Sequence, residues 1–322
     1  MTKPYPELLT IAIPTFNRRE SLLEVVGRAR DTGVTTKARL VVFDDGSSDG
    51  TLEALEDLTY SGLGGVVRSP VNRGYGHTFV EIIRCTATRY VMVSTDDDFL
   101  CPKGVEAVQE DLRRCQPDLL VTAFPRHGRR PRSGSFGAQV RPNEIRDAFN
   151  HAPGIVYRAQ AATPYLPIVA SRLRDGCSMA AAYPQVLLGL CLAATHLSVW
   201  SKAQPVVEGN KLPSGIRRPD GLPYSAPQSR VEQMLDYDGF LEEHQHSLST
   251  PQGARFVRKA LENHRRRALL DLLLAFQTRT PNLAMALAWR SLLGLVLAPR
   301  RTLKFLLARR GHRREHDPEG TI

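Results

Sequence analysis

Short apolar runs alternate with longer segments of helical spacing over the first 124 residues of the chain. The runs are rich in Leu, Ile and Val, as is typical of strands that are buried on both faces. They lie at 8–13, 39–43 and 65–68, in the stretch from Tyr90, and at 118–124. The segments between them predict helices at 22–33, 52–58, 76–85 and 102–115. This alternation predicts an α/β fold, with an open and mostly parallel sheet flanked by helices.

The pattern changes after this region. Residues 126–142 are rich in Arg, Gly and Ser and predict a loop, whereas residues 154–158 predict one more strand. The apolar stretch from Met179 to Leu197 predicts one long buried helix that contains Pro184.

Prolines divide the rest of the chain. Residues 209–228 hold four of them and predict an extended linker, and the chain from Arg230 onward predicts helices interrupted at later prolines. We therefore expect three parts: an α/β domain at 1–208, a Pro-rich linker at 209–229 and a basic, amphipathic helical extension at 230–322.

The net charge of +10 is concentrated near the end of the chain. Residues 255–314 contain fifteen Lys or Arg and two acidic residues, and their longest apolar run is far too short to span a membrane. Basic residues beside apolar helical faces favour helices that lie in an anionic membrane interface. A helical subdomain packed on the sheet domain is the open alternative. Because no nucleic-acid-binding motif is recognisable, we expect no nucleic-acid partner.

The composition is that of a globular protein, with 42% apolar and 24% charged residues. The five cysteines form no CxxC pair and are odd in number, which favours free thiols in a reducing compartment. No long apolar segment precedes the first predicted strand, so we expect no signal peptide. These observations predict a cytoplasmic protein, peripheral to the inner face of the plasma membrane if its basic extension binds lipid.

Polar segments directly follow four of the predicted strands. They are 14–17, 44–49, 72–74 and 96–98. The first begins with a proline, which we expect to end the first strand. Ligands of open parallel sheets bind outside the carboxyl ends of the strands, so we expect these segments to share one rim. The many carboxylates of this rim would repel phosphate, and a nucleotide ligand would therefore need a cation. Mg²⁺ or Mn²⁺, held by one or two carboxylates and by diphosphate oxygens, meets that need.

Each segment also has a simpler structural explanation. Residues 96–98 are three aspartates that a solvated loop or a helix start would tolerate. Residues 14–17 are compatible with a plain turn, and Ser48 or Asp49 would cap the helix that follows. The occurrence of all four segments in this order favours a ligand site.

From about Leu8 to Phe124 the chain resembles the family 2 glycosyltransferases with a GT-A fold. The resemblance rests on Ile13-Pro-Thr-Phe-Asn17, Val42-Phe-Asp-Asp-Gly-Ser-Ser-Asp-Gly-Thr51, Asn72-Arg-Gly74 and the three aspartates at 96–98. It implies a nucleotide-sugar donor of UDP or dTDP type, a divalent metal (Mn²⁺ or Mg²⁺) and transfer with inversion at the anomeric carbon.

The resemblance also implies roles for residues after the first two strands. Pro14, Thr15 and Asn17 would line the nucleoside pocket. Asp45 would face the base, with Asp44 close by.

The other implied roles lie after the third and fourth strands. Asn72 and Arg73 would bind the donor, and Asp96 would approach its ribose or sugar. Asp97 and Asp98 would stand nearest the metal.

The triplet departs slightly from the family pattern. The usual Asp-x-Asp-Asp would put its first Asp at Thr95. Three aspartates after a small polar residue resemble the abequosyltransferase-like members, which act in polysaccharide assembly.

The general base is harder to identify. Many members carry Glu-Asp near the start of a helix after the sheet domain, but the corresponding stretch here is Tyr183-Pro-Gln185. Asp175 is the nearest carboxylate and our candidate base, with His127 and His151 as weaker ones. A surface aspartate without a catalytic role is an equally simple explanation of Asp175.

These observations lead to one hypothesis and two alternatives. We expect a metal-dependent inverting glycosyltransferase that moves a sugar to a glycan or polyprenyl-linked acceptor in cell-surface polysaccharide assembly. Transfer to a polyprenyl phosphate or a small molecule is the alternative within enzymes. Because residues 183–185 lack the acidic pair of many family members, a non-catalytic binding or scaffold protein with the same fold is the third possibility.

Overall fold

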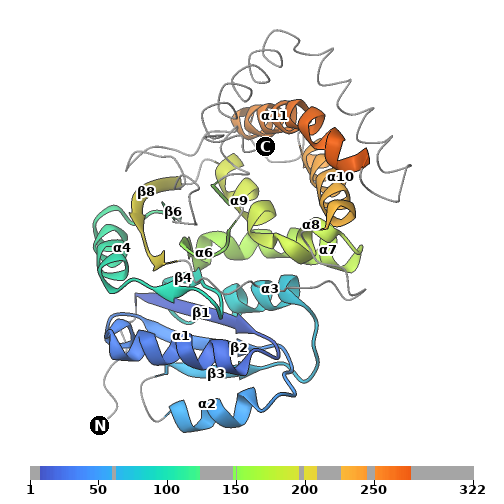
Figure 1. Cartoon of the computed structure of the whole chain (residues 1–322). Helices are drawn as coiled ribbons and strands as arrows, with labels where there is room; N and C mark the ends of the chain where they lie inside the picture. Colours follow the sequence, from blue (N-terminus) through green and yellow to red (C-terminus); the bar gives the residue numbers. More distant parts are fainter. Residues whose placement is uncertain are drawn as a thin grey trace, which may run out of the picture.

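A seven-stranded sheet with helices on both faces forms the centre of the protein (Figure 1). The computed structural model describes residues 8–59, 63–123, 148–149, 151–195, 199–208, 226–244 and 251–276. Its strands are β1 (Leu9–Thr15), β2 (Arg39–Asp44), β3 (Gly65–Arg68), β4 (Tyr90–Val93), β5 (Phe99–Leu100), β6 (Leu119–Ala123), β7 (Ile155–Arg158), β8 (Val199–Pro205) and β9 (Val207–Glu208). The longer helices are α1 (Arg19–Asp31), α2 (Thr51–Thr59), α3 (Tyr75–Cys85), α4 (Pro102–Cys115), α7 (Leu166–Arg174), α9 (Pro184–Ala194), α10 (Pro227–His244) and α11 (Pro251–Phe276), with short ones at α6 (Ala159–Ala162) and α8 (Ser178–Ala182).

The strand order of the large sheet is β3-β2-β1-β4-β7-β6-β8. Neighbouring strands run parallel except at β7, which is antiparallel to both β4 and β6. A small antiparallel pair of β5 and β9 lies after the fourth strand. The structure confirms the expected open, mostly parallel sheet flanked by helices.

Alternate residues of the central strands enter two different cores. Leu9, Ile11 and Ile13 of β1 pack with the apolar faces of α1 and α4. Ala12 faces the other way, into a second core with α3, α7 and α9. Because both faces are covered, the central strands are apolar throughout, as the sequence indicates.

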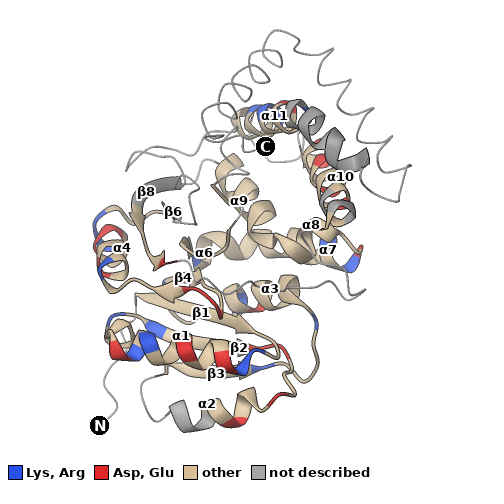
Figure 2. Ribbon diagram, in the orientation of Figure 1, with Lys and Arg blue, Asp and Glu red and all other residues tan. Residues whose placement is uncertain are grey.

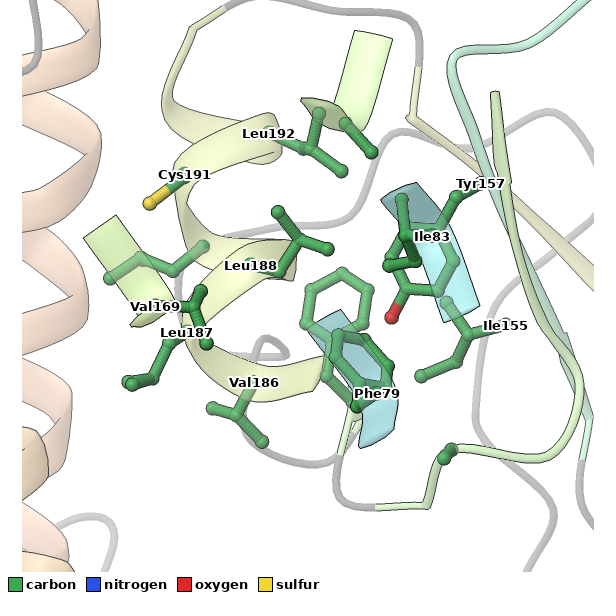
Figure 3. Packing of buried hydrophobic residues seen from close by; sticks show 14 of the residues in the cluster. Phe79, Ile83, Ile155, Tyr157, Val169, Val186, Leu187, Leu188, Cys191 and Leu192 are labelled. Atoms are coloured by element: carbon green, nitrogen blue, oxygen red, sulfur yellow. The ribbon is translucent and has the colours of Figure 1, made fainter. Parts of the chain in front are cut away.

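The second core is built around α9, which carries no charged residue and is uniformly tan in Figure 2. Its Leu187, Leu188 and Leu192 belong to the same buried cluster as Phe79 of α3 and Tyr157 of β7, and Leu188 lies on the side of α9 that faces Phe79 (Figure 3). The rings of Phe79 and Tyr157 meet edge to face, with centroids 5.9 Å apart. This packing anchors α3, which begins at the edge of the sheet where the predicted ligand site lies.

Helices α10 and α11 extend the same core beyond α8 and α9, on the side away from β3 (Figure 1). Tyr237 and Phe240 of α10 and Val257 of α11 are buried in it. Arg265 of α11 bonds both oxygens of the buried Asp238 of α10, at 3.0 and 3.1 Å. Helix α10 and the first part of α11 therefore pack against the second core.

Two predictions about prolines are wrong. The strand β1 continues through Pro14 to Thr15. A proline is tolerated at position 14 because the ladder to β4 ends at Ala12, so no hydrogen bond of the sheet requires an N–H at that position. The long helix expected over 179–197 is two helices, α8 and α9. Pro184 lacks an N–H and would clash with the preceding turn, so the chain leaves helical geometry at Tyr183 and restarts at Pro184.

Some elements have no clear signal in the sequence. The strand β8 is polar in its second half, yet it pairs in parallel with β6 and completes the sheet. Helix α7 also went unpredicted, and α10 already begins at Pro227, inside the expected linker. The loop at 126–142, most of the linker and residues 277–322 lie outside the described residues. None of the described helices combines the length and the apolar character that crossing a bilayer requires.

Candidate functional site

The carboxyl ends of the central strands form one rim, as the sequence predicts. Thr15 at the end of β1 lies in register with Asp44 at the end of β2. The next backbone N–H, of Asp45, donates to the Thr15 carbonyl at 2.9 Å. On the other side of β1, the Ser94 N–H donates to the Ala12 carbonyl at 2.8 Å, and the acidic triplet follows two residues later.

The three aspartates after β4 are nearly buried. Asp96, Asp97 and Asp98 are 5%, 8% and 7% exposed. The Thr15 hydroxyl donates to Asp96 Oδ2 at 2.9 Å, and the Ser21 hydroxyl donates to the Asp96 carbonyl at 2.7 Å. This burial excludes the fully solvated loop that was the simpler explanation of the triplet.

A basic residue that the sequence analysis missed, Arg18, contacts the triplet. Its Nη1 donates to Asp96 Oδ1 at 2.8 Å, and its Nη2 donates to Asp97 Oδ2 at 3.2 Å. Arg18 directly follows the Ile13–Asn17 motif, and that adjacency is the signal from which it could have been found. One guanidinium thus bridges two nearly buried carboxylates, which offsets part of their mutual repulsion.

Burial raises the pKa of Asp96 to about 6, although Arg18 and the Thr15 hydroxyl favour its charged form. The neighbouring charge of Asp97 raises the pKa further. Asp96 is therefore mostly ionised at neutral pH and becomes protonated under mildly acidic conditions.

The triplet suits a divalent cation only in part. In the described part of the chain, no group of three His, Cys, Asp or Glu side chains could hold an ion by itself. Asp98 accepts a hydrogen bond from Thr95 Oγ1 at 2.8 Å, so the triplet is ordered. Mg²⁺ and Mn²⁺ sites in nucleotide-binding proteins use one or two carboxylates and take their other ligands from phosphate. The side chains of Asp97 and Asp98 fit that donor set.

Asp45 organises the loop at 72–74. Its Oδ1 accepts from the Arg73 N–H at 3.1 Å, and its Oδ2 accepts from the Gly74 N–H at 2.7 Å. The Asn72 side chain also accepts from the Gly74 N–H, at 2.9 Å. The Asp45 oxygens are thus used to hold the start of α3, and its expected role towards a base stays a prediction.

Gly46 allows this loop to approach. Its φ of +79° is favourable only for glycine, and an added Cβ would lie 2.8 Å from the Val71 carbonyl carbon and 2.9 Å from the Asn72 nitrogen. The glycine after Asp45 is therefore required by both its backbone conformation and its contact.

The loops after β1 and β2 are joined through Asn17, which has a positive φ of 51°. Its N–H donates to Ser47 Oγ at 2.9 Å, and its side-chain oxygen accepts from the Ser48 N–H at 2.8 Å. The carboxylate of Asp44 accepts from the Ser47 N–H at 3.2 Å. The N-cap of α2 is Gly50, one residue after the position predicted, because the Gly50 carbonyl accepts from the Ala54 N–H. The side chain of Asp49 still caps the first turn of α2, since it accepts from the Thr51 N–H, and it also accepts from the Arg19 N–H at the start of α1.

The candidate base Asp175 lies apart from this network. It is exposed at the end of α7, and its side chain makes no hydrogen bond to the described residues. Its helix nevertheless reaches the rim, because Gly76 in the first turn of α3 lies against Leu173 and Ala180. The structure therefore brings Asp175 to this side of the sheet but does not join it to the triplet.

A further carboxylate in this region, Asp236, comes from α10 and had no signal in the sequence. It is partly buried, and its Oδ2 accepts from the Met179 N–H at 3.1 Å, which caps α8. Burial raises its pKa.

The structure thus brings most of the predicted residues together in three groups. Thr15 joins Asp96 and, through Arg18, Asp97. Asn17 and Asp44 meet at Ser47, and Asp45 holds residues 72–74. Pro14 lies beside them in β1, half-buried.

Comparison with known proteins links this rim to a family. The model of the family described as glycosyl transferase family 2 matches residues 10–166, just under half of the chain. The match contains β1, the rim and the acidic triplet.

Two curated proteins resemble part of this chain. It is 36% identical over 77 residues to the undecaprenyl-phosphate 4-deoxy-4-formamido-L-arabinose transferase of Pseudomonas fluorescens, which covers 23% of each protein. It is 38% identical over 71 residues to the glycosyltransferase AglJ of Haloferax volcanii, or 22% of each protein. The similarity thus spans less than a quarter of the length of either relative.

Solved structures resemble nearly the whole chain. TarS residues 1–349 of S. aureus superpose with a TM-score of 0.62 over 92% of this chain and 82% of that 1–349 chain, at 13% identity. The complex of the same TarS segment with UDP-GlcNAc gives a TM-score of 0.63 over 89% of this chain and 79% of the TarS 1–349 chain, at 14% identity. At this identity the similarity establishes the fold, which extends from the sheet into the C-terminal helices.

Proposed function

We propose, from the glycosyl transferase family 2 domain at residues 10–166, that this protein is a glycosyltransferase. It would move a sugar from a nucleotide-sugar donor to a glycan or lipid-linked acceptor in cell-surface polysaccharide assembly. The observation that carries the proposal is the network at the rim, in which Thr15 and Arg18 hold the nearly buried Asp96 and Asp97. The nearly buried carboxylates suit the hydroxyl groups of a sugar and a metal-bound diphosphate. The loops at the carboxyl ends of the strands lie where ligands of open parallel sheets bind.

Each group at the rim would have a separate task. Asp96 and Thr15 would bind hydroxyl groups of the donor ribose or sugar, and the loops held by Asn17 and Asp45 would enclose the nucleoside. Asp97 and Asp98 would hold Mn²⁺ or Mg²⁺. When bound, such an ion supplies positive charge beside the leaving diphosphate.

Transfer would invert the anomeric carbon, with a carboxylate on the acceptor side taking the proton of the attacking hydroxyl. We assign this general base to Asp175, whose helix lies against the start of α3. Its exposure leaves the acceptor side open to solvent until an acceptor is bound.

The finer identity is part of the same proposal. The three aspartates after Thr95 favour an abequosyltransferase-like member, and the TarS complex with UDP-GlcNAc supports a UDP-type donor. One relative is an undecaprenyl-phosphate 4-deoxy-4-formamido-L-arabinose transferase, which supports a lipid-linked acceptor or, as the alternative, a polyprenyl phosphate itself. We propose that the reaction occurs at the cytoplasmic face of the membrane.

One observation favours a second candidate, a binding protein without catalysis. The start of α9, where many family members have an acidic pair, carries Gln185, which is buried and whose Oε1 has no hydrogen-bond partner among the described residues. An amide cannot take a proton from an acceptor hydroxyl.

A thermal-shift screen of nucleoside diphosphates tests the proposal. We expect one of UDP, dTDP or GDP, at about 100 times its Kd, to raise the Tm by several degrees with Mn²⁺ and much less with EDTA. The shift should shrink as the pH falls through 6, because Asp96 then takes up a proton. No shift with any nucleotide would contradict donor binding. A shift without slow hydrolysis of the matching nucleotide sugar would favour the non-catalytic candidate.

Membrane attachment is a separate prediction. Arg255, Arg258 and Lys259 lie exposed on one face of α11, and nine more Lys or Arg follow Arg267. Truncation after Arg267 is expected to reduce co-sedimentation with anionic vesicles several-fold and to leave the weak binding to neutral vesicles unchanged. Circular dichroism of the truncated protein controls for unfolding. If the truncated protein is folded and co-sediments with anionic vesicles as well as the full-length protein does, the extension does not bind membrane and serves only to pack on the sheet domain.

A further inference from the structure

Arg18 is fixed between the triplet and the first helix. Its carbonyl accepts from the Leu22 N–H at 3.0 Å, so the residue is the N-cap of α1. Its guanidinium bonds Asp96 at 2.8 Å and Asp97 at 3.2 Å. The Ser21 hydroxyl, one turn along, bonds the Asp96 carbonyl. Backbone and side chain therefore hold Arg18 in one position relative to both carboxylates.

The contact with Asp97 creates a conflict of charge. Asp97 is one of the two carboxylates that fit a divalent cation, and one of its oxygens already accepts from Arg18. A cation at Asp97 would stand close to the guanidinium, and two positive charges in a nearly buried site repel each other strongly. A guanidinium does not lose its proton in proteins, so the repulsion ends only if the side chain moves.

We propose that Arg18 competes with the divalent cation for Asp97. This inference rests on the proposed function, and it concerns how the divalent cation binds at Asp97. Without a donor, Arg18 holds Asp97 and the cation binds weakly. A nucleoside diphosphate brings negative charge to the rim, which attracts both the cation and the released guanidinium. Cation and donor therefore bind together, and Arg18 is the positioning residue that couples them.

The Arg18→Gln variant tests the competition with Mn²⁺ alone. Titration followed by the electron paramagnetic resonance signal of free Mn²⁺ is expected to show binding about tenfold tighter in R18Q than in the unmodified protein. Addition of UDP should strengthen Mn²⁺ binding in the unmodified protein more than in R18Q, because only the former has a competitor to displace. The control is R30Q, since Arg30 lies on the same helix and pairs with the exposed Asp31. It should bind Mn²⁺ like the unmodified protein.

Two outcomes would contradict the proposal, and they can be distinguished. Equal or weaker Mn²⁺ binding in R18Q overturns the competition and leaves the metal site intact. Absence of Mn²⁺ binding in every protein, with and without UDP, overturns the competition together with the proposed metal site. If R18Q does not fold, R18K replaces it, because a lysine keeps the charge but lacks the fork that bonds two carboxylates. R18K should bind Mn²⁺ more tightly than the unmodified protein, and equal binding would again contradict the proposal.

Discussion

The double substitution Asp97→Ala, Asp98→Ala is expected to lower release of nucleoside diphosphate from the matching nucleotide sugar by roughly 10³-fold or more. These two carboxylates are the proposed ligands of the cation beside the leaving diphosphate. Without them, the negative charge that develops on the phosphate would have no fixed partner at the rim. The measurement is donor hydrolysis with Mn²⁺, using the nucleotide sugar whose diphosphate stabilises the protein.

The structure offers a control for this variant. Asp31 at the end of α1 is an exposed carboxylate that pairs with Arg30, far along the helix from Arg18. Asp31→Ala should hydrolyse the donor at the normal rate. Because removal of two buried charges also leaves Arg18 without one partner, thermal unfolding of the double variant must first show a folded protein. A folded double variant with undiminished hydrolysis would contradict the metal assignment.

Gly46→Ala is expected to have the largest effect on stability among the substitutions of the rim. A methyl group at this position would meet the Val71 and Asn72 backbone at 2.8 and 2.9 Å, and alanine is strained at a φ of +79°. Strain and overlap together should lower the free energy of unfolding by about 3 kcal/mol. Chemical denaturation measures this change.

Gly50→Ala is the matched control for the overlap. Gly50 has nearly the same φ, +80°, in the same loop, but an added Cβ would come no closer than 3.9 Å to other atoms. Its substitution should cost only the strain, about 1 kcal/mol. The difference between the two variants isolates the contact with residues 71–72. Equal losses would show that the loop at 72–74 moves freely away from Gly46.

Gly46→Ala should also weaken nucleotide binding more than Gly50→Ala does. The displaced loop includes Arg73 and Gly74, whose N–H groups bond Asp45. A thermal-shift titration at a temperature where both variants are folded separates this effect from the loss of stability.

Much of the fold could be predicted from short-range patterns. The strands around Ile11, Val42 and Met92 are apolar because both faces of the sheet are covered, and their burial agrees with the pattern. Asp49 was identifiable as a cap because capping acts over two or three residues. The break at Pro184 could also have been predicted, because it follows from the missing N–H of proline. The apolar pattern continues across Pro184, however, and it favoured a single helix.

The pairing of segments that are distant in the sequence could not be predicted from such short-range patterns. The strand β8 forms because β6 offers it an open edge, and nothing in its own residues required that partner. The packing of α10 and α11 on α9 likewise depends on apolar faces that meet only in the folded chain.

For the site, the sequence by itself determined which polar groups stand at the ends of the strands, because strand order and local motifs place residues 14–17, 44–49, 72–74 and 96–98 at one edge. Only the tertiary structure decided which of these groups bond each other. Arg18 and Asp96 are 78 positions apart, and Asp45 and Gly74 are 29 apart. The interaction energy of two charges depends on the distance between them and on how deeply they are buried. For residues so far apart along the chain, both quantities are set by the folded structure and cannot be derived from the sequence. The acidic triplet was therefore visible as a group of carboxylates, but the guanidinium that holds two of them appeared only with the fold.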